Sequence, residues 1–91
     1  MHYEIKIAEL AETFPTIQDA PLRPWDARAF EKWALEHQGS GLRHAAQFVL
    51  AVWSVDEPWK IGRFEVFAAM GAWDTAHHQA FAAWSSSPWT R

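Results

Sequence analysis

Three histidines are the residues of this chain best suited to chemistry. His44 lies in the middle of the chain, and His77 and His78 lie near its end. Together with a carboxylate they could hold a metal ion or move a proton, because imidazole is both a common metal ligand and a general base. No two histidines have the i, i+4 spacing that makes a helical zinc motif. A small metal-binding domain or enzyme using these three residues is therefore an alternative, and we predict no cofactor.

Other catalytic groups are sparse. Asp56, Glu57 and Glu65 lie around the expected helix over 63–72, and acids do general acid–base work only in a pocket that separates their pKa values. The chain has no cysteine, no serine in a G-x-S-x-G elbow and no G-x-G-x-x-G loop. We expect Asp74 and His78, four residues apart, to pair near a helix start. The sequence thus predicts no catalytic residue and a protein that is not an enzyme.

The composition excludes several classes of partner. The 91 residues carry a net charge of −3, which argues against a grip on nucleic acid that neutralises phosphates. The longest apolar run, 66–73, is far shorter than a membrane span. The first ten residues lack a signal-peptide pattern, and the absence of cysteine suits a reducing compartment. We therefore expect a cytoplasmic protein that binds neither nucleic acid nor membrane.

Aromatic residues are the unusual feature of the composition. Seven tryptophans and six phenylalanines are more than a small core can easily enclose, since each buries about 150–250 Å². We expect core positions for Trp33, Trp53, Trp73 and Trp84. Three other tryptophans each follow a proline and lie outside helix interiors. With a nearby cation they form the predicted binding surface, because exposed Trp and Arg are typical interface anchors: Trp25, Trp59, Trp89 and Arg63.

These anchors favour a small protein-interaction module with an accessory or regulatory role. A second interpretation is that the three loop tryptophans only close helix ends. A third is a self-associating structural protein, whose surplus aromatic residues are covered by a second copy. The expected partner is therefore another protein or the chain itself.

Positioning these residues requires helices. The pattern predicts an all-α fold, a compact bundle of four to five short helices around a central apolar helix over 41–53, with 1–91 as a single helical domain. Ser40 is the expected N-cap of the central helix. Its buried stripe repeats at helical spacing: Leu42, Ala45, Ala46, Val49, Val52 and Trp53.

The flanking segments complete the bundle. Residues 1–14 predict a helix ending before Pro15, with a short N-terminal strand over 2–8 as the alternative, and 15–24 predict a loop. A helix over 25–37, capped at Asp26, has an expected wet face of Arg28, Glu31, Lys32 and Glu36 and a buried stripe that includes Phe30, Ala34 and His37. A helix over 63–72 is apolar enough for burial on two sides, and a last helix over 75–86 starts from Asp74.

Overall fold

The computed structural model describes residues 2–91, which form five α-helices and one short 3-10 helix, with no strand among them. In chain order these are α1 (His2–Glu12), η1 (Pro15–Ile17), α2 (Ala27–Leu35), α3 (Ser40–Trp53), α4 (Val66–Ala72) and α5 (Thr75–Ser86). The prediction of an all-α bundle is confirmed. The alternative strand over 2–8 is wrong, because those residues belong to α1.

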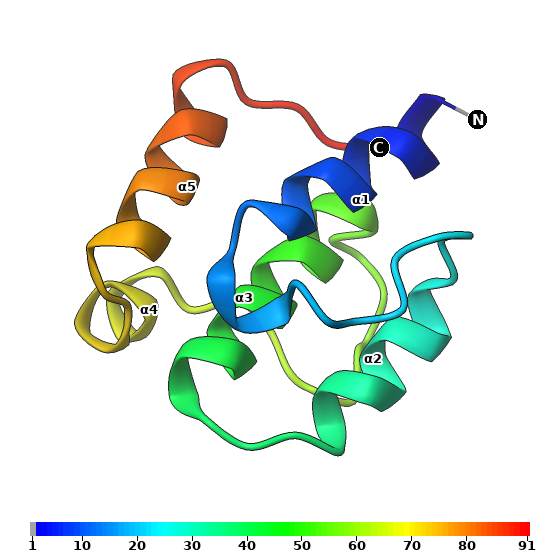
Figure 1. Cartoon of the computed structure of the whole chain (residues 1–91), viewed down its shortest axis with the longest axis horizontal. Helices are drawn as coiled ribbons and strands as arrows, with labels where there is room; N and C mark the ends of the chain where they lie inside the picture. The colour runs from blue at the N-terminus through cyan, green and yellow to red at the C-terminus, as the bar shows by residue number, and fades with distance from the viewer. Residues whose placement is uncertain (1) are drawn as a thin grey trace.

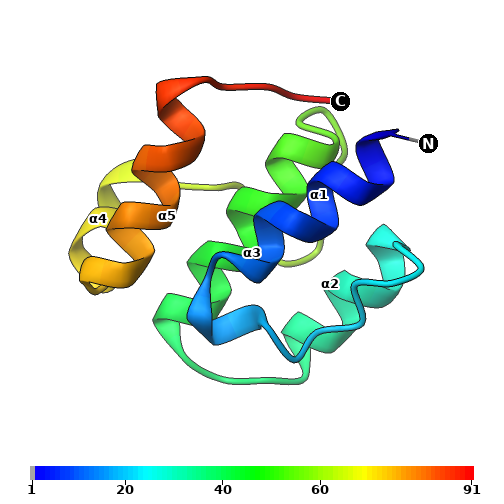
Figure 2. The ribbon, with the colours of Figure 1, turned by 45° about the horizontal axis from the view of Figure 1, so that its top comes forward.

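Helix α3 lies at the centre of the molecule, and the other helices surround it (Figure 1). Helix α1 lies against it, α2 lies on one side of it, and α4 and α5 lie on the other side (Figure 2). The chain is apolar all round from Phe48 to Trp53, and a helix of this kind is stable only when other elements cover most of its surface. The expected central helix is therefore confirmed. Its N-cap is Gly39 rather than Ser40, because the chain enters the helix at a φ of 127°, which glycine adopts most readily.

Phe14 joins three elements at the centre of the core. Pro15 follows the end of α1, and the chain turns there into η1. The Phe14 ring is fully buried, with its centroid 5.7 Å from that of Phe48 on α3 and 5.8 Å from that of His77 on α5. The loop after α1 thus contributes a central core residue.

Helix α2 is shorter than expected. It is capped at Asp26, whose side chain accepts hydrogen bonds from the backbone N–H groups of Arg28 and Ala29, as predicted. It ends at Leu35, so His37 lies outside the helix and is exposed rather than buried. Glu31 was expected on the wet face but is only 3% exposed, because a later segment of the chain covers that side of α2.

Helix α4 departs most from expectation. It begins at Val66, and Ala69 is its one buried residue, so burial on two sides is wrong. Phe64 precedes the helix in extended chain and fills the space beside Phe48 and Phe81, with ring centroids 5.1 Å and 6.0 Å away. Since Phe64 takes this place, the outer face of α4 has no cover within residues 2–91, and the Phe67 side chain is left 92% exposed.

Candidate functional site

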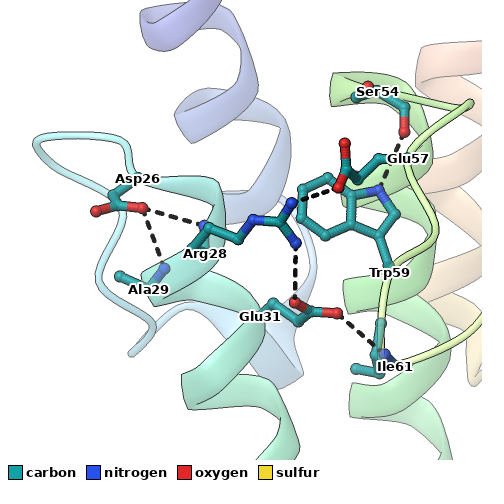
Figure 3. Close-up of polar contacts among 8 residues, drawn as sticks. All are labelled: Asp26, Arg28, Ala29, Glu31, Ser54, Glu57, Trp59 and Ile61. Atoms are coloured by element: carbon teal, nitrogen blue, oxygen red, sulfur yellow. Dashed lines mark hydrogen bonds and ion pairs between the residues drawn. The ribbon is translucent and has the colours of Figure 1, made fainter.

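The segment 54–65 connects α3 to α4 and carries two of the predicted binding residues. It is anchored by Ile61, whose side chain is buried. The Ile61 N–H donates to the Glu31 carboxylate of α2 at 3.1 Å (Figure 3), and its carbonyl accepts from the Gln47 amide of α3 at 2.8 Å. Side chains from two helices thus satisfy the peptide groups of a buried loop residue, which would otherwise be costly to bury.

Arg28 fixes the middle of the same segment. Its guanidinium donates to the Glu57 carboxylate and lies 4.9 Å from the centroid of the Trp59 ring (Figure 3). The Trp59 indole N–H donates to the Ser54 carbonyl at 3.0 Å. A guanidinium over an indole is a favourable cation–π arrangement. Trp59 is therefore held in one orientation, half-buried, by contacts at both its face and its N–H.

Trp59 and Arg63 line one hollow, here named the polar pocket, of about 440 Å³. The chain turns at Gly62 with a φ of 97°, where a side chain would be strained. Arg63 follows this turn and is exposed. The pocket lining mixes charged, amide and apolar side chains: Gln47, Ala51, Val55, Glu57, Pro58, Trp59, Gly62, Arg63 and Phe64.

A second hollow, here named the apolar groove, adjoins the polar pocket and has a volume of about 320 Å³. The two hollows share Ala51, Val55 and Phe64. The groove is lined from α3, segment 54–65, α4, α5 and the C-terminal tail by Phe48, Ala51, Val52, Val55, Phe64, Val66, Phe81, Trp84 and Thr90. Val55 at its rim is 70% exposed, and Phe67 follows the lining residue Val66. Val55 and Val66 of the lining are themselves exposed, so the groove is an accessible apolar surface.

The other two predicted anchors lie elsewhere. The Trp25 ring packs against Phe30 and Trp53, with centroids 5.2 Å and 5.5 Å away. Its indole N–H is buried without a hydrogen-bond partner among the described residues. Trp89 accepts a hydrogen bond at its carbonyl from the Trp84 indole, and the Lys6 ammonium lies 4.4 Å from its ring. The structure therefore brings Trp59 and Arg63 together and leaves Trp25 and Trp89 outside both hollows.

The C-terminal end of α3 is closed by the chain itself. The Arg91 backbone N–H donates to the Val52 carbonyl at 3.1 Å, and the Arg91 Nε donates to the Trp53 carbonyl at 3.0 Å. These carbonyls belong to the last helical turn, whose acceptors have no partner within a helix. Segment 54–65 and the tail thus meet at one end of α3, beside the two hollows.

Two of the candidate metal ligands make separate local contacts. The His44 Nδ1 lies 3.2 Å from the Gln47 side-chain oxygen, and the His78 Nε2 lies 3.1 Å from the Trp73 carbonyl. Across residues 2–91, no three or more His, Asp or Glu side chains are grouped so that they could hold a metal ion.

His77 is the most connected histidine. It is 3% exposed, with Nδ1 2.7 Å from Asp74 Oδ1 and Nε2 2.8 Å from Thr16 Oγ1. The hydrogen bond from the His77 ring, helped by the His77 backbone N–H, holds the pKa of the Asp74 carboxyl below its ordinary value of 3.8. Asp74 caps α5, as predicted, but it pairs with His77 rather than His78, because its oxygen faces the N–H groups three residues on.

Sequence reasoning missed two exposed apolar residues, Val55 of the groove lining and Phe67 of α4. Phe67 belongs to the helix that was expected to be buried on two sides, yet both residues are strongly exposed. The signal was the breadth of the apolar run 66–73, which exceeds what one buried face of a seven-residue helix requires.

Comparison with protein-family models, with curated proteins and with solved structures finds no match to this chain. Within residues 2–91, no helix has both the length and the apolar character that a bilayer crossing requires.

Proposed function

We propose that this chain is a small protein-interaction module, with an accessory or regulatory role, that binds its partner over the apolar groove and the polar pocket. The observation that supports this function is the apolar lining of the groove together with the exposed Phe67, which follows the lining residue Val66 on α4. A phenylalanine side chain gains about 1.5–3 kcal/mol when it is fully buried. A partner that covers Phe67 would therefore bind about 10- to 100-fold more tightly than one that does not.

The polar pocket adds specificity to this proposal. Arg63 is exposed and has no ion-pair partner within residues 2–91, and the indole beside it is already fixed in place. Trp59 and Arg63 are therefore the proposed anchors, and Trp25 and Trp89 are not part of this surface. The fitting partner presents an apolar side chain to the groove and a carboxylate to Arg63. The proposed setting for this binding is the cytoplasm, in keeping with a chain that has no cysteine.

Site-specific photocrosslinking tests the proposal. The variant Phe67→p-benzoylphenylalanine is expressed in the native cells and irradiated, and the adducts are identified by mass spectrometry. The matched control is Leu35→p-benzoylphenylalanine, since Leu35 is also an exposed apolar helix residue but lies on α2, across α3 from α4 (Figure 1). The expected result is one defined protein adduct at position 67 and none of that mass at position 35.

A second substitution shows whether the groove itself is used. Val55→Asp places a charge at the groove rim on a side chain that is 70% exposed, so it leaves the fold intact and removes the adduct. An adduct of twice the chain's own mass, formed by the purified protein alone, would favour the self-associating alternative. Equal labelling from positions 67 and 35, or none from either, would refute the proposed surface.

A further inference from the structure

A second constellation lies at the other end of α3, away from both hollows. It consists of the hydroxyl of Thr16 on η1, the imidazole of His77 and the carboxylate of Asp74, joined in that order. The two contacts, 2.8 Å and 2.7 Å, are both within hydrogen-bonding distance. A nucleophile bonded to a base, with the base oriented by a third group, is the arrangement found in acyl-transfer centres of unrelated folds.

The protonation pattern follows from the partners. An ionised carboxylate only accepts hydrogen bonds, so the His77 Nδ1 must donate to Asp74. In the neutral imidazole the Nε2 then has a free lone pair and accepts the hydrogen of the Thr16 hydroxyl. Asp74 is also the N-cap of α5, and the same oxygen accepts the His77 backbone N–H. This second hydrogen bond fixes the position of the carboxylate. The base is thus held in the tautomer that can remove the threonine proton.

The base and the nucleophile differ in their exposure to solvent, since His77 is buried and Thr16 is exposed. His77 is 3% exposed and packs against the rings of Phe14 and Trp73, with centroids 5.8 Å and 5.9 Å away. Thr16 is exposed on η1, and a Cβ atom on Gly41 would lie 3.8 Å from its methyl group. The reacting oxygen therefore belongs to a surface residue beside the first turn of α3, while solvent is kept from most of the imidazole.

We propose that Thr16 is a nucleophile that accepts an acyl group from an ester, with His77 as the general base and Asp74 as a positioning residue. The Thr16 Oγ1 forms a bond to the carbonyl carbon of the ester, and its proton moves to the His77 Nε2. The ester C–O bond then breaks, and the proton passes to the departing alkoxide, which leaves as an alcohol. Water can then attack the acyl-threonine ester and give its proton to the His77 Nε2. The proton passes to the departing Thr16 oxygen, and the acyl group is released as a carboxylic acid.

Acetylation by p-nitrophenyl acetate tests this assignment on the full chain. Release of p-nitrophenolate is followed by absorbance, and the acetylated residue is located by mass spectrometry. The expected result is an acetyl group on Thr16 that is absent in Thr16→Val and retained in Thr16→Ser, which keeps the hydroxyl.

The variant Asp74→Asn separates chemistry from architecture. Asparagine is as good an N-cap as aspartate, so α5 is preserved and the chain stays folded at neutral pH. Its amide oxygen can still accept the His77 Nδ1–H but carries no negative charge to stabilise the imidazolium that forms, so the rate of Thr16 acetylation falls by about 100-fold or more. Acetylation confined to other residues would overturn the assignment, and so would an Asp74→Asn variant in which Thr16 is acetylated at the normal rate. The hydrogen bonds among the three residues would then only connect η1 to α5.

Discussion

Removal of the Glu31 carboxylate is the sharpest test of how the proposed binding surface is held. In Glu31→Ala the buried N–H of Ile61 loses its acceptor, because within residues 2–91 its one hydrogen bond is the 3.1 Å contact to Glu31. An unsatisfied buried N–H costs about 1–3 kcal/mol. In a chain of this size the melting temperature then falls by roughly 5–20 °C, since each kcal/mol corresponds to roughly 4–8 °C.

Two matched variants isolate the cause. Glu31→Gln keeps an oxygen that can accept the Ile61 N–H, so it should change the free energy of unfolding by less than about 1 kcal/mol. Glu36→Ala removes an exposed glutamate near the end of the same helix and should stay within about 0.5 kcal/mol. Urea unfolding followed by circular dichroism gives all three values.

Amide hydrogen exchange provides the local measurement. We expect the Ile61 amide to be protected in the wild type and in Glu31→Gln, and to exchange much faster in Glu31→Ala. If Ile61 protection is the same in all variants and Glu31→Ala costs no more than Glu36→Ala, then segment 54–65 is not anchored as described. The partner captured from position 67 should also bind less well to Glu31→Ala, because Trp59 and Arg63 lie in the segment that loosens.

Three further outcomes can be measured on the same purified chain. Phe14→Ala empties the centre of the core and should cost about 3–5 kcal/mol in urea unfolding. Trp25→Phe removes a buried N–H that has no partner, which offsets the lost volume, so the free energy of unfolding should change by less than about 1 kcal/mol. The folded chain lowers the pKa of Asp74, so the His77–Asp74 hydrogen bond stabilises the fold above the ordinary pKa of 3.8 and loses its effect as the pH falls below it. Asp74→Asn should therefore show a shallower fall of melting temperature below that pH than the wild type.

The fold class could be predicted because helix periodicity is a local property. The apolar residues of α3 repeat at the spacing of one buried face and continue until the helix is apolar all round, and only a central position satisfies that pattern. The caps at Asp26 and Asp74 were also predictable, since each lies immediately before its helix.

The burial of individual faces could not be predicted, because it depends on segments distant in sequence. Glu31 lies beside a buried stripe, and the helical pattern alone predicts that it is exposed. In the structure Ile61, thirty positions later in the chain, covers it. Phe67 has the spacing of a core residue, but Phe64 takes the place beside Phe48 and Phe81. The position of a residue in the helical repeat therefore does not tell which of several apolar side chains occupies the core.

The tryptophans illustrate the same limit. All seven lie within residues 2–91, and Trp73 alone is classed with the buried core. Trp33, Trp53 and Trp84, expected in the core, are half-buried and pack against its edge. The excess of aromatic residues correctly indicated that the core could not enclose every ring. It could not indicate that the most exposed aromatic side chain would be a phenylalanine.

The length of α3 makes the two proposed activities independently adjustable. Its 14 residues span about 21 Å at 1.5 Å per residue. Thr16 lies beside Gly41 in the first turn, whereas Ala51 and Val52 line the groove at the last turn. Substitutions more than about 7–10 Å apart usually have additive effects. Substitutions at the C-terminal end of α3 could therefore change which partner binds, while Thr16 at the N-terminal end of the helix keeps its reactivity.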